Sequence, residues 1–328
     1  MFFFLLMFSI FFIISSNSWI NCWIGLEINT LSFLTLILNK KFFINSEFII
    51  KYYLIQSISS INFLFFILLF NLNMININSS FYNLILINLN LTLLIKMGSA
   101  PFHFWLISII EGISWFNTLI LLTLQKIPPM ILLSYYLNMK TLIFIIVLNC
   151  FFGSLGGLSQ LNLQKILTYS SIYNFSWMFS SLMINESLFF FFFIIYSLII
   201  MNLIIFFSEM KLFSINQLYL IKSNKYIMFL IFLNFLSLGG LPPFLGFITK
   251  WIISMYMIQS MNLIVLIMIL SSLINLYYYI QLMFPFMMIQ KFENKWIINN
   301  KMNSTFKLIF SYFSLFTLIL SSMLMYIY

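Results

Sequence analysis

The stretch LIKMGSAPFHFW occupies residues 94–105 and interrupts a long apolar segment of the chain. Gly98 and Pro101 lie three residues apart inside it. Proline removes a backbone donor and clashes with the preceding turn, so a helix that enters this stretch is expected to break there. Lys96, a charge in otherwise apolar sequence, stands immediately before the break. The stretch therefore predicts a broken helix with a lysine beside the break.

A second stretch of the chain has the same character. LGGLPPFLGFITKW occupies residues 238–251 and contains a Gly-Gly pair, a Pro-Pro pair and Lys250. Apolar sequence continues on both sides of each break, so both breaks are expected inside a membrane. Irregular backbone is tolerated there only where it faces protein or a water-filled cavity. In transporters, such broken helices mark ion and substrate sites.

The composition of the whole chain supports a membrane setting. Its 328 residues include 15 basic and 6 acidic side chains, while 63% are hydrophobic and 20% aromatic. A soluble domain with 6% charged residues could not cover its surface, since about 25% is usual. These values exclude a soluble enzyme and a disordered chain. The lysines are scattered singly between apolar runs, which excludes a nucleic-acid binder.

The lengths of the apolar segments predict an all-α polytopic membrane protein, one domain over residues 1–328, with about eleven transmembrane helices of about 20 residues each. The fourth and ninth segments contain the two breaks and are too long for one straight helix. The predicted helices are 2–16, 19–38, 48–72, 81–110, 114–137, 141–158, 161–183, 187–208, 226–258, 262–289 and 306–327.

The two discontinuous helices are five helices apart in this order, so they run in opposite directions. Two inverted five-helix repeats produce this arrangement in transporters. We therefore predict an antiporter-like fold with a first repeat over 2–137, a second over 141–289, and a final helix at 306–327.

Loop lysines predict how the chain is oriented. Excess lysine marks the side from which helices are inserted. Loops after even-numbered helices hold eight lysines, and loops after odd-numbered helices hold only Lys140. The N-terminus is therefore expected on the positive side and the C-terminus on the opposite side. The eight lysines are Lys40, Lys41, Lys211, Lys222, Lys225, Lys291, Lys295 and Lys301.

Four charged residues remain inside the predicted helices: Glu27, Lys96, Lys126 and Lys250. A Lys or Glu at the bilayer centre costs at least about 2.5–3.5 kcal/mol, which indicates that these residues have a use. Burial disfavours the charged form of a lysine, so a buried lysine can take up and release protons near neutral pH. At an effective dielectric of about 20, two charges about 4 Å apart interact by about 4 kcal/mol. Lysines in series with a glutamate can therefore pass a proton along.

Structural interpretations of the same charges stay open. Lys126 and Glu27 could form an ion pair between helices, and Lys96 could extend its amine toward a helix end.

Three further candidates carry two interpretations each. Lys165, near the start of its helix, could relay protons or extend to the membrane surface. His103, the only histidine, could relay protons or be a hydrogen-bonded structural residue. Glu111 could relay protons or be a solvated charge at a helix end. A single histidine cannot build a metal site. Two cysteines, Cys22 and Cys150, cannot supply the four thiolates of an iron–sulfur cluster.

Five motifs together resemble the chain 2 family of mitochondrial NADH–ubiquinone oxidoreductase, respiratory complex I. They run in order and at matching spacing from about residue 19 to 285. The absence of Arg and Asp, with a single Ala, also indicates an A/T-rich, insect-like organelle genome. The motifs are WIGLEIN at 23–29, KMGSAPFHFW at 96–105, QKIPPM at 125–130, QKILTYSSI at 164–172 and the Gly-Pro stretch at 238–251.

The resemblance implies an antiporter-like, proton-translocating core subunit of the mitochondrial inner membrane. Its N-terminus would face the matrix and its C-terminus the intermembrane space. In the family, the residues that match Glu27, Lys96, Lys126 and Lys250 form the central proton path. Glu27 would pair with Lys96, and Lys126 would connect two half-channels.

The resemblance also implies the partners and cofactors. The partners would be other membrane-arm subunits of complex I and the phospholipid bilayer, in a hetero-oligomer that binds no nucleic acid. The chain itself would hold no cofactor and no metal. FMN, iron–sulfur clusters and ubiquinone would belong to the complex as a whole, whose other subunits carry electrons from NADH to ubiquinone. One departure is that many relatives have a Pro-Glu pair where Ile107 and Ser108 stand here.

Two other functions remain open from the sequence. The chain could be a stand-alone cation/proton antiporter of related fold, or a purely structural membrane subunit.

Overall fold

The computed structural model describes residues 1–38, 46–73, 79–219, 225–242 and 244–288. Within these ranges the regular secondary structure is helical, apart from a single β-bridge between Asn162 and Ser214. The chain divides into two compact units, Met1–Ile145 and Ile146–Tyr328. The all-helical architecture confirms the predicted fold class. The predicted helix at 306–327 lies outside the described residues, and the count of eleven stays a prediction.

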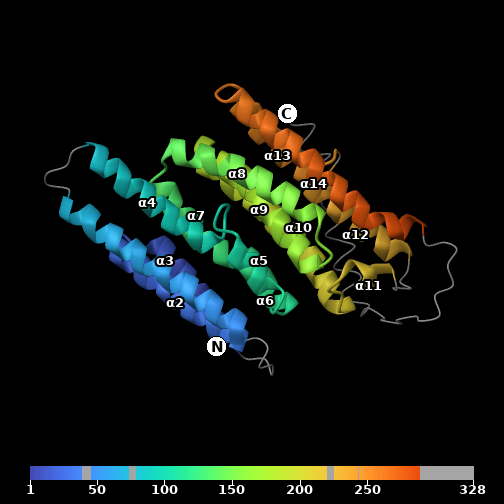
Figure 1. Ribbon diagram of the computed structural model, residues 1–328, viewed down its shortest axis with the longest axis horizontal. Helices are drawn as coiled ribbons and strands as arrows, with labels where there is room; N and C mark the ends of the chain where they lie inside the picture. Colours follow the sequence, from blue (N-terminus) through green and yellow to red (C-terminus); the bar gives the residue numbers. More distant parts are fainter. Residues whose placement is uncertain (39–45, 74–78, 220–224, 243, 289–328) are drawn as a thin grey trace. The chain divides into compact units, whose positions relative to one another are not determined.

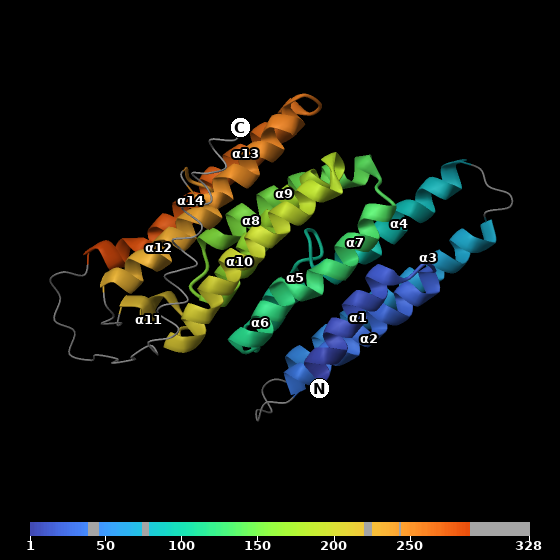
Figure 2. The ribbon, with the colours of Figure 1, turned by 180° about the vertical axis from the view of Figure 1, so that it is seen from behind.

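The first unit holds the helices before residue 146. Helices α1, α2 and α3 pack in sequence, α4 packs on α3, and α7 contacts both α1 and α4; Figure 2 shows α1 lying along α2. Short helix α5 packs against α3. The elements are α1 (Phe2–Ser15), α2 (Trp19–Leu38), α3 (Ser46–Asn73), α4 (Ser79–Met97), α5 (Phe104–Ile110), α6 (Trp115–Leu122), the 3-10 turn η2 (Leu124–Lys126) and α7 (Ile127–Tyr135).

The second unit is built around helix α9, in which 18 of 22 residues are buried. Helices α10, α13 and α14 contact α9, and α12 packs on α10, α13 and α14. Figure 1 shows α9 and α10 running alongside each other. Helix α8 (Met139–Leu158) crosses the boundary between the two units. The other elements are α9 (Leu163–Ile184), α10 (Glu186–Met210), α11 (Ile215–Tyr219), α12 (Lys225–Gly239), α13 (Leu245–Ile258) and α14 (Asn262–Met288).

Helix α9 contains many polar residues for a buried helix, and its serine hydroxyls form hydrogen bonds within the helix itself. The hydroxyls of Ser170 and Ser176 each donate to the carbonyl three residues earlier, at 2.7 Å. Glycine lets α8 approach α9 closely, since a Cβ on Gly153 would lie 2.5 Å from the backbone nitrogen of Tyr173. Small residues allow this kind of close packing between membrane helices.

Six described helices are long and apolar enough to cross a membrane, and four shorter apolar helices accompany them. The shorter ones arise largely because predicted helices are interrupted. Segment 81–110 forms α4 and α5 with a break between them, and segment 226–258 forms α12 and α13 with a second break.

A third interruption falls inside predicted helix 114–137. Helix α6 ends at Leu122, the 3-10 turn follows, and α7 begins at Ile127. Pro128 and Pro129 lie in the first turn of α7, where a missing N–H removes no helical hydrogen bond. The prolines therefore begin a new helix, and the irregular backbone lies just before them, around Lys126.

Candidate functional site

The first break is closed by a glycine in the left-handed region. Gly98 has φ +72°, and its N–H donates to the carbonyl of Ile95 at 3.1 Å and also to the carbonyl of Leu94 at 3.0 Å. The N–H of Ser99 donates to the same carbonyl at 3.2 Å. This is the Schellman arrangement, which ends a helix sharply and satisfies its last carbonyls. It fixes Lys96 in the last turn of α4.

Neutral side-chain donors also bind carbonyls at the end of α4. The Trp105 indole Nε1 on α5 donates to the Ile95 carbonyl at 3.1 Å. The Gln56 amide on α3 donates to the Lys96 carbonyl, also at 3.1 Å. The backbone of the break is thus held without help from the Lys96 amine.

The Lys96 side chain is buried, with 6% of its surface exposed. Its Nζ has no hydrogen-bond partner within the described residues. Glu27 on α2 acts on this amine electrostatically, and it acts on the Tyr52 hydroxyl as well. No direct ion pair joins Glu27 to Lys96 in the described part of the chain. Lys96 is therefore a buried amine on which one carboxylate acts electrostatically.

Lys126 is the most deeply buried lysine in the described ranges, with 1% of its surface exposed. It ends the 3-10 turn and directly precedes α7. A small cavity of about 10 Å³ is lined by both Lys96 and Lys126, together with Gln56 and Gln125. About 10–15 Å³ is enough to hold one water molecule. The fold thus brings two lysines 30 residues apart in sequence to one water-sized space.

An amide pair holds the Lys126 side of this cavity against α2. Asn29 Nδ2 donates to Gln125 Oε1 at 2.9 Å, and Gln125 Nε2 donates back to Asn29 Oδ1 at 3.3 Å. Ser9 on α1 donates to the same Asn29 oxygen at 3.4 Å. Glu27 lies two residues before Asn29 on α2. The amide pair therefore links the helix of the glutamate to the turn of the lysine.

The second break repeats the backbone geometry of the first. Gly240 has φ +83°. The N–H groups of Gly240 and Leu241 both donate to the Leu236 carbonyl, at 3.0 and 3.2 Å. Gly246 adds a close approach, because a Cβ there would lie 1.7 Å from the Ser237 carbonyl oxygen. The two breaks are the same structural device, one in each unit.

The lysine of the second break has a different environment from Lys96. Lys250 Nζ, on α13, donates to the carbonyls of Leu238 and Gly239 at 3.0 and 2.9 Å. It also lies 5.3 Å from the centre of the Tyr173 ring, within the range of a cation–π contact. A cation at a helix C-terminus is favoured by the partial negative charge there. Lys250 therefore caps α12 across the break.

A protein-family model matches most of this chain. The family described as "NADH:quinone oxidoreductase/Mrp antiporter, TM" matches residues 16–276. The chain belongs to this family. NADH-ubiquinone oxidoreductase chain 2 of Anopheles gambiae is 41% identical over 95% of this chain and 93% of the relative. The protein of the same name from Locusta migratoria is 38% identical over 88% of this chain and 85% of the relative.

Solved structures of the NADH:quinone oxidoreductase/Mrp antiporter fold agree with the architecture. A chain of respiratory complex I from Thermus thermophilus superposes with a TM-score of 0.84 at 20% identity, covering 97% of this chain and 76% of that one. A chain of the Mrp complex from Dietzia superposes with a TM-score of 0.75 at 13% identity, covering 85% and 58%. The antiporter-like membrane fold is thereby confirmed.

The remaining candidates of this family member are not among the residues that line the Lys96–Lys126 cavity. His103 is 2% exposed, contacts the Pro101 carbonyl through Nδ1 at 3.2 Å, and lies against the Phe104 ring. Glu111 is exposed at the end of α5. Lys165 is half-buried in the first turn of α9. The roles predicted for these three residues stay predictions.

Some polar groups of the site were not predicted. Asn29 and Gln125 stand within two residues of Glu27 and Lys126, so their position beside a charge was an available signal. Gln56 has no such neighbour, and its contact with the break appears only in the fold. Within the described residues, no group of three His, Cys, Asp or Glu side chains could hold a metal ion.

Proposed function

We propose that this chain moves protons across the mitochondrial inner membrane as a core membrane subunit of respiratory complex I. The observation that carries the proposal is the buried Lys96 amine. It lacks a hydrogen-bond partner in the part of the chain that the structure describes, and it lies beside a water-sized cavity that Lys126 also lines. A water there would satisfy the Lys96 amine and give the proton a path between the two lysines. The names of the relatives support membership of an oxidoreductase complex.

Glu27 serves in this proposal as the group that biases the first lysine. Its carboxylate favours the protonated form of Lys96 while it is charged. A change in that interaction would release the proton toward Lys126. Lys250 is the proposed acceptor in the second unit, where two carbonyls and the Tyr173 ring favour its charged form.

Electron transfer from NADH to ubiquinone is assigned to other subunits, which would hold the FMN and iron–sulfur clusters. We propose that this chain binds no redox cofactor and works among other membrane-arm subunits. Its N-terminus would face the matrix and its C-terminus the intermembrane space, as the loop lysines indicate.

The test is Lys126→Met in the assembled complex. Methionine is apolar and of similar length, so it removes the titratable amine without leaving a buried charge unpaired. We expect the complex with Lys126→Met to continue to oxidise NADH, while its proton uptake into reconstituted vesicles falls to background. Lys140→Met is the matched control, because Lys140 is exposed at the start of α8; it should pump normally. Normal pumping by an assembled Lys126→Met complex would contradict the proposal.

A stand-alone cation/proton antiporter is the competing function. The purified chain alone, placed in vesicles, should exchange no sodium for protons if the proposal is right. Robust exchange by the isolated chain would favour the competitor.

A further inference from the structure

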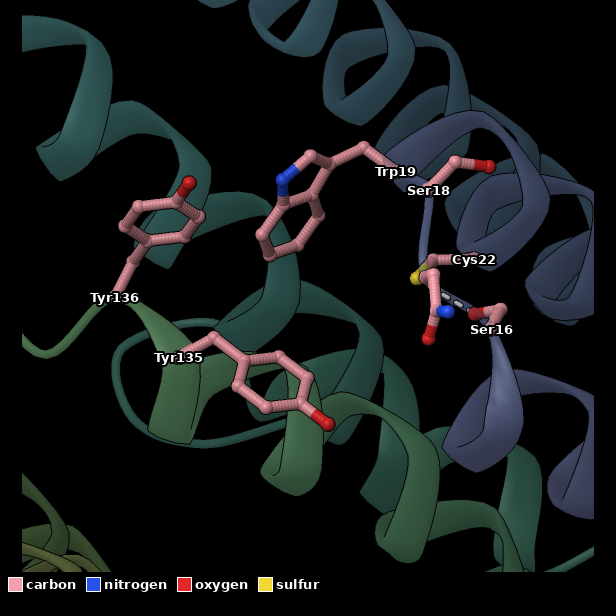
Figure 3. A pocket seen from close by; sticks show the side chains of 7 residues that line it. Ser16, Ser18, Trp19, Cys22, Tyr135 and Tyr136 are labelled. Atoms are coloured by element: carbon pink, nitrogen blue, oxygen red, sulfur yellow. Dashed lines mark hydrogen bonds between the residues drawn. The ribbon is translucent and has the colours of Figure 1, made fainter.

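A second cavity lies at one end of the first unit, away from the lysine site. It has a volume of about 380 Å³ and is lined by Ser16, Asn17, Ser18, Trp19, Cys22, Tyr135 and Tyr136. Ligand pockets are usually about 300–1,000 Å³. Figure 3 shows the two tyrosines on one side of the space and the Ser16–Cys22 pair on the other, with Trp19 between them.

The cavity lies at the edge of the predicted membrane region. Candidate span Trp19–Leu38 begins with one of its aromatic residues, and candidate span Trp115–Tyr135 ends with another. Trp and Tyr are enriched at this depth, where lipid headgroups meet hydrocarbon. A ligand in the cavity would therefore be at the level of the headgroups.

Trp19 and Tyr136 pack against each other, and Tyr135 stands nearly perpendicular to Trp19, so that these rings form a corner of the cavity. The rings of Trp19 and Tyr136 have centroids 4.8 Å apart and are tilted by 36°. The rings of Trp19 and Tyr135 have centroids 6.2 Å apart and are nearly perpendicular, at 84°. Ring faces carry partial negative charge, and arrangements of several such rings bind quaternary ammonium groups.

The opposite wall is polar but uncharged. The Ser16 hydroxyl there already donates to the Ile13 carbonyl at 2.9 Å and lies 3.0 Å from Cys22 Sγ. The Ser18 hydroxyl and the Asn17 amide are the donors that this wall offers to a ligand. None of the seven lining residues carries a formal charge. An anionic headgroup would therefore find no cation here, while a zwitterion would find ring faces for its cation and donors for its phosphate.

From this geometry we infer that the cavity binds the headgroup of a choline phospholipid of the surrounding bilayer. The trimethylammonium group lies in the corner between Trp19 and Tyr135, with Tyr136 holding the Trp19 ring in place, and the phosphate lies near Asn17 and Ser18. A primary ammonium, as in phosphatidylethanolamine, is more strongly hydrated and binds less well to ring faces. The acyl chains remain in the bilayer, so the site holds a lipid and not a soluble compound.

The test compares lipid retention by the intact complex. The complex is stripped of lipid in mild detergent and given equal amounts of phosphatidylcholine and phosphatidylethanolamine with identical acyl chains. After washing, the lipids that remain are measured by mass spectrometry. We expect Tyr136→Leu and Trp19→Leu to reduce the phosphatidylcholine held at this site about tenfold, equivalent to about 1.4 kcal/mol.

Three controls make the outcome decisive. Tyr136→Phe keeps the ring and should retain phosphatidylcholine, which separates loss of binding from misfolding. Tyr256→Leu removes an exposed tyrosine near the end of another helix, α13, and should also retain it. Unchanged retention in Tyr136→Leu, or equal retention of the two lipids by the unmodified complex, would overturn the inference. Displacement by equimolar phosphocholine would identify a soluble ligand instead and would overturn it as well.

Discussion

At the scale of single residues, the two break lysines occupy different environments. Lys250 reaches back 11 and 12 residues to donate to the carbonyls at the end of α12. At the first break, the side chains of Trp105 and Gln56 donate to the carbonyls at the end of α4 instead. The Lys96 amine lacks a hydrogen-bond partner among the described residues. Lys250 therefore stabilises the backbone around it, whereas the Lys96 amine is acted on electrostatically by Glu27.

This difference gives a prediction for Lys250. Lys250→Met leaves two carbonyls without their donor, and each unsatisfied buried group costs about 1–3 kcal/mol. Lys250→Arg keeps the donors but cannot release a proton. We expect faster hydrogen–deuterium exchange over residues 225–258 in the Met variant only, and loss of proton pumping in both. Normal pumping by Lys250→Arg would assign this lysine a purely structural role.

Sequence alone predicted the charges of the site but not this distinction. Lys96 and Lys250 were recognisable because each stands near Gly and Pro in apolar sequence. The environment of Lys96 depends on a donor from another helix. Gln56, which binds the Lys96 carbonyl, lies 40 residues earlier in the sequence. Contacts between residues so far apart in the sequence depend on how the helices pack. All the helices are similarly hydrophobic, so their sequences do not specify which of them pack together.

At the scale of elements, the breaks depend on one glycine each. The sequence predicted both positions, because Gly and Pro end helices for local reasons. The interruption after Thr123 also had a local signal in the sequence, because Pro128 and Pro129 follow it closely. The backbone of Thr123 is irregular, with φ −121° and ψ −76°. The two prolines have no N–H to donate to the carbonyls of Leu124 and Gln125, so a regular helix cannot continue through this stretch.

Neighbouring glycines at the second break provide a matched comparison. Gly240→Ala puts a side chain on a residue with φ +83° and within 2.9 Å of Lys250 Cδ. The left-handed conformation alone costs a residue with a Cβ about 1–2 kcal/mol. Gly239→Ala meets its nearest atom at 3.5 Å and should be tolerated. We expect the thermal midpoint of the complex to fall for Gly240→Ala only; equal midpoints would refute this account of the break.

At the scale of the whole molecule, each of the two units contains one glycine-closed break with a lysine beside it, and the first unit contains the interruption at Lys126 as well. The two compact units meet at residue 145, and the division into repeats between residues 137 and 141 stays a prediction. The inverted relation between the repeats stays a prediction. The composition of the chain indicated a membrane protein, whereas the amide pair between Asn29 and Gln125 emerged only from the packing of the helices.

Orientation in the membrane can be checked within the first unit. Lys51 lies near the start of α3, after the lysine-bearing loop that follows α2, and Lys140 lies near the start of α8; both are exposed. The loop-lysine pattern puts Lys51 on the matrix side and Lys140 on the intermembrane-space side. In mitochondria stripped of their outer membrane, an impermeant amine reagent should label Lys140 alone and Lys51 only after permeabilisation. The reverse order would invert the proposed topology.

The amide pair between Asn29 and Gln125 has a consequence for tolerance to mutation. Phe, Ile and Leu on helix surfaces are nearly interchangeable to surrounding lipid, so they do little to stop one helix sliding lengthwise past another. Two amides that bond to each other do so at only one axial offset. Many apolar residues on the lipid-facing surface of α2 can therefore be substituted without shifting Glu27 relative to Lys126, provided that the hydrogen bonds between Asn29 and Gln125 are kept.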